Sequence, residues 1–448
     1  MTATEDQTSS AEAHTPPADG PANTDTPANT DTPANVTGHF DTSDQGAALP
    51  PAAEAVVRRR RVQTRQKRVT LWGVLVTLLC VGLLGGLAYV GYEASLRVGG
   101  GTESRVTDPA EPGYVADPRP TDTDLFVVTD AEGGFASALI LVPDQSGQGG
   151  TAVPLSPSFV VPEYDGSPPM FLTDLYAEGG IDGLRERLGI ALSFEIDSAE
   201  TVPLEAVTQL AGGEAIEIDN VDNLGARGED GSEEVRYPAG ALTLQPEEIV
   251  DFMAFEGADD PAPNQALRTE AVWEELLARA SVTQQPELPE GERSLDSDAP
   301  GFADALWSLV GGDVRFENVP MERVQVPDSY LVAWMPDPAT LDQFVARVVP
   351  LPVNPAPGVR TATAILNGTT NADATAAAVP EVVSSGGWVS IVGNADSFDV
   401  ATTTVEYAGA EAADTAMKIA AMLGVEATEA TDAIESASVR VTLGGDAQ

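Results

Sequence analysis

The sequence predicts a mixed α/β protein with two globular domains and a single membrane-spanning helix. Three observations support this fold class. An uncharged apolar segment follows a cluster of cations in the first hundred residues. Short apolar runs then alternate with segments of helical periodicity as far as residue 350. After a proline-rich stretch, the same alternation of strand and helix patterns returns in residues 359–448, which indicates a second α/β unit.

The N-terminal part predicts a tail and a membrane anchor. Residues 1–57 contain the repeat PANTDT and few large apolar side chains, so we expect a disordered tail. Residues 58–68 are strongly basic, and residues 69–92 contain no charged side chain. A helix over residues 69–92 would be about 36 Å long, enough to cross a hydrocarbon core of about 30 Å. The flanking cations place the tail in the cytoplasm. A cleavable signal peptide is disfavoured because the segment is long and far from the start.

The first globular domain is predicted at residues 121–350, after a Gly/Pro-rich linker at residues 93–120. Its pattern predicts an α/β sandwich in which strands alternate with helices. Two apolar runs separated by Gly133-Gly134 predict two strands and a turn. Residues 192–197 alternate as a half-buried strand would, and residues 348–358 form a proline-rich linker that should hold the neighbouring domains apart. The expected strands are residues 125–130, 136–143, 192–197 and 214–218, and the expected helices are residues 175–188, 204–210, 244–255 and 265–280.

The second globular domain, residues 359–448, has the predicted order β-α-β-β-α-β. Its sequence resembles the LytR C-terminal domain family. Short motifs carry the resemblance: Asn367-Gly368-Thr369 after the first strand, Gly393-Asn394-Ala395 after the second, and Glu406-Tyr407 in the third. Further matches are Met422 to Val425 and Val441 to Asp446.

The first globular domain resembles the catalytic domain of the LytR–CpsA–Psr family. The segments LYAEGGIDGLRERLGI (residues 175–190) and PLEAVTQLAGGEAIEI (residues 203–218) carry this resemblance. Members of that family attach anionic glycopolymers to peptidoglycan from a polyprenyl-pyrophosphate donor. The resemblance implies that arginines hold the pyrophosphate and that acidic residues hold a magnesium ion.

Most of the family's chemical groups are absent from this chain. The turn that should supply an arginine and a carboxylate reads VPLSP (residues 153–157), and the segment that should carry paired arginines reads DFMAFEGADD (residues 251–260). Two family-matching positions remain. Asp124 matches an acidic position that can contribute to magnesium binding, and Arg268 matches one arginine. The competing interpretation is structural, with Asp124 at the start of a strand and Arg268 paired with Glu270 or Asp260.

Composition excludes several classes of binding and catalytic site. The chain of 448 residues has 70 Asp+Glu and 23 Lys+Arg, for a net charge of −47, so it would repel nucleic acid. The histidines are His14 and His39, so a Ser-His-Asp triad or ordinary zinc site is excluded after residue 39. The lone Cys80 lies in the apolar segment and cannot form an intramolecular disulfide.

The sequence therefore favours a non-catalytic relative of the wall-polymer transferases, a binding or scaffolding protein of the bacterial cell envelope. It would cross the cytoplasmic membrane once, with its N-terminus in the cytoplasm and its C-terminus outside. Peptidoglycan, a wall glycopolymer or another envelope protein are the candidate partners, and no cofactor is expected beyond a residual magnesium ion at Asp124. The alternative is an active transferase with a site rebuilt from Arg185, Arg187 and Arg236 near Asp124.

Overall fold

The computed structural model describes residues 106–227, 233–257, 260–283, 300–325 and 332–446. The predicted tail (1–57), basic segment (58–68) and membrane helix (69–92) lie outside these residues. Among the described residues, no helix combines the length and apolar character needed to cross a membrane.

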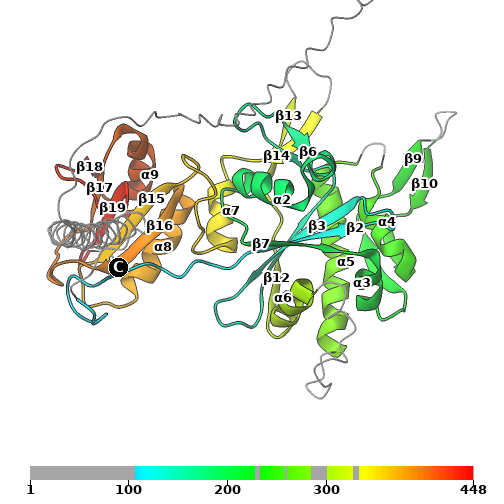
Figure 1. Cartoon of the computed structure of the whole chain (residues 1–448), viewed down its shortest axis with the longest axis horizontal. Coiled ribbons are helices and arrows are strands. Elements are labelled where there is room, and N and C mark those ends of the chain that lie inside the picture. Colours follow the sequence, from blue (N-terminus) through cyan, green and yellow to red (C-terminus); the bar gives the residue numbers. More distant parts are fainter. Residues whose placement is uncertain (1–105, 228–232, 258–259, 284–299, 326–331, 447–448) are drawn as a thin grey trace, which may run out of the picture. The chain divides into compact units, whose positions relative to one another are not determined.

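A five-stranded sheet forms the centre of the first globular domain (Figure 1). The central strand β3 pairs antiparallel with both β2 and β4, while the outer strands β7 and β12 pair parallel with β2 and β4. In spatial order the strands are β12 (Val314–Phe316), β4 (Gly150–Leu155), β3 (Phe135–Pro143), β2 (Asp124–Thr129) and β7 (Ser198–Val202).

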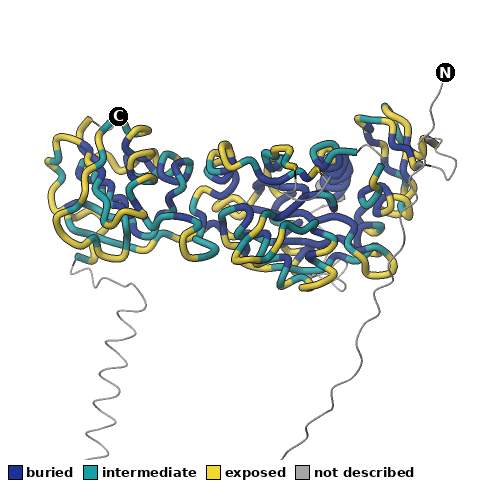
Figure 2. The backbone as a smooth tube through the Cα atoms, turned by 90° about the horizontal axis from the view of Figure 1, so that it is seen from above, coloured by how far each residue is buried: buried dark blue, intermediate teal, exposed yellow. Residues whose placement is uncertain are grey.

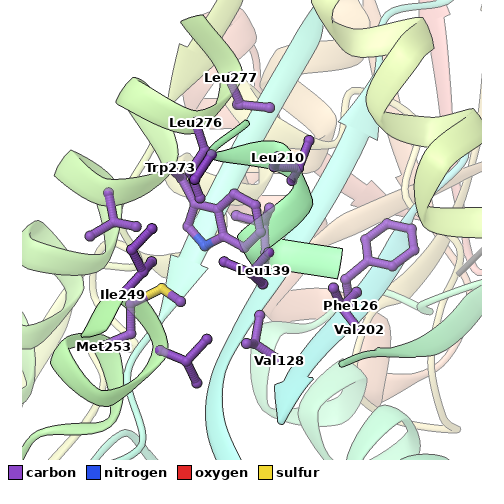
Figure 3. Close-up of a cluster of buried hydrophobic side chains, with 14 of the residues drawn as sticks. Phe126, Val128, Leu139, Val202, Leu210, Ile249, Met253, Trp273, Leu276 and Leu277 are labelled. Carbon is purple, nitrogen blue, oxygen red and sulfur yellow. The ribbon is translucent and has the colours of Figure 1, made fainter. Parts of the chain in front are cut away.

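Helices cover both faces of this sheet, which confirms a mixed α/β architecture. Side chains of a strand alternate between faces, and β2 follows this rule with every second residue. Phe126 and Val128 belong to one core cluster, which also holds the buried Trp273 (Figure 3). Leu125 and Val127 belong to the other cluster. The three inner strands β2, β3 and β4 are buried almost throughout (Figure 2), and the outer strands β7 and β12 are partly exposed. The first face is covered by α3 (Leu204–Leu210), α4 (Ile249–Ala254), α5 (Ala262–Thr283) and α6 (Pro300–Val310), and the second by α2 (Leu172–Leu192) and α7 (Leu341–Val348).

The strand predicted at residues 192–197 is wrong. Helix α2 continues to Leu192, Ser193 then adopts the left-handed conformation (φ 62°), and the strand begins only at Ser198.

Short strand pairs surround the central sheet. They are β5 (Val160–Val161) with β6 (Met170–Phe171), β8 (Ile216–Asn220) with β11 (Gly240–Leu244), β9 (Leu224–Arg227) with β10 (Glu233–Tyr237), and β13 (Met321–Gln325) with β14 (Val332–Pro336).

The C-terminal domain contains the predicted β-α-β-β-α-β order with two additions. A short strand, β18, precedes the last strand, and β1 (Val115–Ala116) pairs antiparallel with β16 at the edge of the sheet. Gly424 ends α9 in the left-handed conformation (φ 73°), as expected of a glycine at that place. The elements are β15 (Thr361–Asn367), α8 (Ala374–Ser384), β16 (Gly387–Asn394), β17 (Thr404–Tyr407), α9 (Ala413–Leu423), β18 (Ala427–Glu429) and β19 (Val439–Leu443), with sheet order β1-β16-β15-β19-β17-β18.

The proline-rich segment 348–358 does not hold its neighbours apart, so that expectation is wrong. Helix α7, which ends at its start, packs against α8, the first helix after it. Val348 and Val349 are buried in the same cluster as Val383 of α8. The apolar side chains of this segment bring the elements together, and this contact outweighs the stiffness of the prolines.

Candidate functional site

The structure brings together the turn after β4 and the first turns of α5, the two places where the family resemblance expects phosphate-binding groups. The hydroxyl of Ser158 donates a hydrogen bond to the side-chain oxygen of Gln265. Gln265 is itself 2% exposed and also donates to the backbone oxygen of Asp260. Gln265 stands where the resemblance predicts a phosphate-binding arginine, and its amide is thus bound to a hydroxyl just beyond the turn 153–157.

Arg268 lies next to these residues, and both of its terminal nitrogens donate to groups of the protein. Its guanidinium forms an ion pair with Asp260 at 2.8 Å, with side-chain exposures of 1% and 3%. It also donates to the backbone oxygen of Phe255 at 2.9 Å and lies 5.8 Å from the ring centre of Phe252. A buried pair of this kind is neutralised internally. The Arg268 charge is therefore not available to a phosphate unless the ion pair with Asp260 opens.

Asp260 is one of the two partners that the sequence suggests for Arg268. The other, Glu270, instead accepts a hydrogen bond from the side-chain amide of Asn318. In the described part of the chain, the buried polar atoms without a partner include the Nε of Arg268, the hydroxyl of Ser156 and the side-chain oxygen of Asn318.

Acidic groups set the electrostatics around Arg268. Burial raises the pKa of Glu256, and the negative charges of Asp260 and Asp174 raise it further. Asp260 and Asp174 therefore each lie close enough to Glu256 to repel its ionised form. A pyrophosphate would add more negative charge at the same place, and like charges brought together cost several kcal/mol.

Asp124 lies at the first residue of β2, in a different part of the domain. In the sheet register it is level with Leu141 of β3, which is level with Ala152 of β4. Ser158 lies six residues beyond Ala152 along the chain, and each extended residue advances about 3.3 Å. The fold therefore separates the two family-matching residues, Asp124 and Arg268, and does not join them in one site.

A cavity of 380 Å³ adjoins Asp124 and is lined by Asp122, Asp144 and Asp197 as well. Asp124 accepts a hydrogen bond from Ser198 at 2.5 Å, and Asp197 accepts hydrogen bonds from Thr123. Burial raises the pKa of Asp124, the hydrogen bond from Ser198 lowers it, and the charges of Asp197 and Asp122 raise it.

The group around Asp124 does not fit the magnesium ion that the resemblance implies. One oxygen of Asp124 and one of Asp197 accept hydrogen bonds from protein donors, and burial disfavours the ionised form of Asp124. Within the described ranges, no cluster of three or more His, Cys, Asp or Glu residues is arranged to hold a metal ion.

The arginines proposed for a rebuilt site bind other groups. Arg185 donates to the backbone oxygen of Ile196 at 2.8 Å, and Arg187 donates to that of Pro162 at 3.2 Å. Arg236 pairs with Asp251 at 3.6 Å and lies over the rings of Tyr237 and Phe255. None of these contacts involves Asp124.

The first C-terminal motif, Asn367-Gly368-Thr369, forms a turn. The side-chain oxygen of Asn367 accepts hydrogen bonds from the backbone and the hydroxyl of Thr369, at 2.9 and 2.8 Å. Its amide donates to the backbone oxygen of Asn371 at 2.8 Å. Gly368 has no room for a side chain, since a Cβ there would lie 2.4 Å from Val400. This motif is explained by folding alone.

The second motif, Gly393-Asn394, forms hydrogen bonds and close contacts with the segment that precedes the first domain. The amide of Asn394 donates to the backbone oxygens of Pro109 and Glu111, each at 2.8 Å, and its backbone nitrogen donates to Tyr114 at 2.7 Å. A Cβ on Gly393 would lie 2.2 Å from the backbone oxygen of Tyr114. Sequence reasoning missed this role because no local pattern links residues so far apart.

Arg360 is a second residue whose role was missed. Its side chain is 0% exposed and pairs with Asp342 of α7 at 2.8 Å. It also donates to the backbone oxygens of Ser193, Val383 and Gly387, at 2.7, 3.0 and 2.6 Å. Burial lowers the pKa of Arg360 and raises the pKa of Asp342, and in each the attraction of the partner opposes the shift.

Comparisons with known proteins locate one family match. The family described as "LytR cell envelope-related transcriptional attenuator" matches residues 360–446. Curated proteins give no match. Among solved structures, a transcriptional regulator from Enterococcus faecalis shares 13% identity with a TM-score of 0.38, over 51% of this chain and 86% of that chain. B. subtilis TagV shares 14% identity with a TM-score of 0.37, over 52% and 96%. B. subtilis TagT shares 11% identity with a TM-score of 0.36, over 55% and 92%. The chain thus carries a LytR C-terminal domain at residues 360–446.

Proposed function

We propose that the chain is a membrane-anchored protein of the bacterial cell envelope that binds or scaffolds and does not transfer glycopolymers. The buried ion pair between Arg268 and Asp260 carries this proposal. Phosphoryl transfer needs positive charge on the phosphate oxygens. Arg268, the one arginine at a family-matching position, forms an ion pair with a carboxylate of the same chain.

The LytR C-terminal domain supports the cellular setting, because the matching family is described as cell envelope-related. The basic segment 58–68 followed by the uncharged segment 69–92 supports an anchor in the cytoplasmic membrane, with residues after 92 outside. Peptidoglycan, a wall glycopolymer or another envelope protein are the partners that fit this setting. The net charge of −47 argues against nucleic acid.

The size of the catalytic loss follows from the site. One lost charge-assisted contact to a reacting oxyanion costs about 3–4 kcal/mol, and each 1.4 kcal/mol is about tenfold in rate. The resemblance places several arginines on the pyrophosphate. Their loss would reduce the rate by many orders of magnitude.

A transfer assay tests the proposal. The full-length protein is given a polyprenyl-pyrophosphate-linked glycopolymer, magnesium and peptidoglycan, and attached polymer is measured. We expect no transfer above a protein-free control. Transfer that disappears in Arg268→Ala or Asp124→Ala would contradict the proposal and support the rebuilt transferase.

The membrane arrangement has its own test. Protease added to intact spheroplasts should digest the part of the chain after residue 92 and spare residues 1–57. Protection of the globular domains together with digestion of the tail would show the opposite orientation.

A further inference from the structure

A second cavity, of 280 Å³, lies between β16 of the C-terminal domain and two proline-containing segments. Its lining includes Trp388 and Ser390 from β16, Asp117 and Pro118 from the segment after β1, and Pro352 from the segment after α7. With Ser436, four stretches far apart in the sequence build it. The proline rings hold two of its walls in fixed conformations, so the cavity is formed before a ligand arrives.

The strand alternation of β16 points Trp388 toward this cavity. Val389 is buried in the core cluster of the C-terminal domain, so its neighbour Trp388 points to the opposite face of the sheet, while Ser390 is the extra residue where the register shifts between Val389 and Ile391. Trp388 is half-buried, and its indole nitrogen makes no hydrogen bond to the described part of the chain. An indole in this position offers an apolar ring face and one unused donor.

Polar groups lie beside the indole. The Ser390 hydroxyl donates to the backbone oxygen of Ser436 at 3.1 Å, which leaves its own oxygen able to accept. Ser436 also lines the cavity, and its backbone is in the left-handed region (φ 56°), a strained conformation for a residue with a side chain. Asp117 adds an exposed carboxylate.

We propose that this cavity binds a neutral pyranose ring of an oligosaccharide. One face of such a ring is apolar and stacks on an indole, while its edge carries hydroxyl groups that donate to a carboxylate or a serine oxygen. An anionic ligand is disfavoured, since the lining residues include Asp117 and no cation. Most of the lining residues are apolar, so an alkyl chain is the competing ligand, but it would cover the carboxylate of Asp117 without replacing its hydrogen bonds to water. The proposal rests on the proposed function, because it names the ligand class of a binding protein in the envelope.

The test is a titration of the full-length protein with chitotetraose, a neutral N-acetylglucosamine tetramer, followed by tryptophan fluorescence and calorimetry. We expect saturable binding that weakens roughly tenfold in Trp388→Ala, as loss of a contact worth about 1.4 kcal/mol would give. Asp117→Asn, an exposed change that leaves the cavity wall intact, should weaken binding as well. Trp334→Phe removes an indole from β14, outside the residues that line the cavity, and should bind as the unaltered protein does.

Each result decides the proposal. Binding of cellotetraose, which lacks acetamido groups, supports recognition of the ring itself, and binding of chitotetraose alone supports recognition of the ring with its acetamido group. Absence of saturable binding of both, or equal binding by Trp388→Ala, overturns it. Binding of farnesyl diphosphate that requires Trp388 would assign the cavity to a lipid and overturn the ligand class. The transfer assay reads a different site, so loss of either proposal is distinguishable from loss of the other.

Discussion

Arg360 offers the sharpest test of how the two globular domains are joined. The substitution Arg360→Met keeps much of the length of the side chain and removes the guanidinium. The backbone oxygens of Ser193, Val383 and Gly387 then lose the donor that Arg360 supplies, and Asp342 loses its partner. Arg360 is fully buried, so water does not readily replace these contacts.

The cost can be worked from these contacts. A buried acceptor that loses its donor costs about 1 kcal/mol or more, so the carbonyl groups of Ser193 and Gly387 give about 2 kcal/mol, while that of Val383 still accepts from the backbone nitrogen of Gly386. Asp342 adds less than a fully buried carboxylate would, because its side chain is 35% exposed and water screens it. We therefore expect Arg360→Met to lower the free energy of unfolding by at least about 2 kcal/mol.

Urea unfolding of the full-length protein, followed by tryptophan fluorescence and circular dichroism, measures this change. Arg347→Met is the matched control on α7, because Arg347 pairs with Glu317 at 3.4 Å with side-chain exposures of 56% and 33%. It should cost under about 1 kcal/mol. Hydrogen exchange should also rise in α7 and α8 of the Arg360 variant alone. A loss under about 1 kcal/mol for Arg360→Met, with unchanged exchange, would refute the reasoning.

Three further predictions concern the contact of Gly393 with the segment that precedes the first domain, the ion pair between Arg268 and Asp260, and the carboxylate of Glu256. Gly393→Ala places a Cβ against the backbone oxygen of Tyr114, so it should cost about 1–3 kcal/mol and speed proteolysis around residues 106–117. Asp260→Ala leaves the buried charge of Arg268 without a partner, so it should lower the free energy of unfolding by about 3–5 kcal/mol. Added inorganic phosphate should restore part of that loss. Stability should rise as pH falls from 7 toward 5, because burial raises the pKa of Glu256 and the folded protein then binds more protons than the unfolded chain.

Each of these predictions has a control or a contrary result. Gly183→Ala is the control for Gly393, since a Cβ at Gly183 meets nothing within 4 Å and should change stability little. Asp260→Ala with a cost under about 1 kcal/mol would show that the ion pair is not closed to water. Glu256→Gln should flatten the rise in melting temperature on acidification. A rise of the same slope in that variant would assign the effect to other groups, such as Asp124 and Asp342, whose pKa values burial also raises.

Local patterns predicted much of the secondary structure. The apolar runs on either side of Gly133-Gly134 became β2 and β3, and the C-terminal order of strands and helices was predicted nearly whole. Residues 192–197 failed because Leu192, Phe194 and Ile196 are buried in alternation without joining a ladder. Burial pattern alone does not distinguish a strand from an extended connection.

Long-range contacts lay beyond the sequence. The pairing of β1 with β16 joins residues 115–116 to residues 392–393 and has no local signal. Arg360 likewise binds groups from three other elements. For Arg268, a signal did exist. Glu270 lies two positions further along the same helix, where side chains do not face each other, which favours Asp260 as the partner.

Direct binding of a polyprenyl pyrophosphate tests the central claim most plainly. Native mass spectrometry of the full-length protein with farnesyl diphosphate and magnesium would count bound ligand, and Arg268→Ala would serve as the comparison. The ion pair between Arg268 and Asp260 predicts no complex above non-specific adducts, with the unaltered protein and the variant indistinguishable. A one-to-one complex that requires Arg268 would show that the ion pair opens to a pyrophosphate, and would contradict the claim that this site has lost its transferase chemistry.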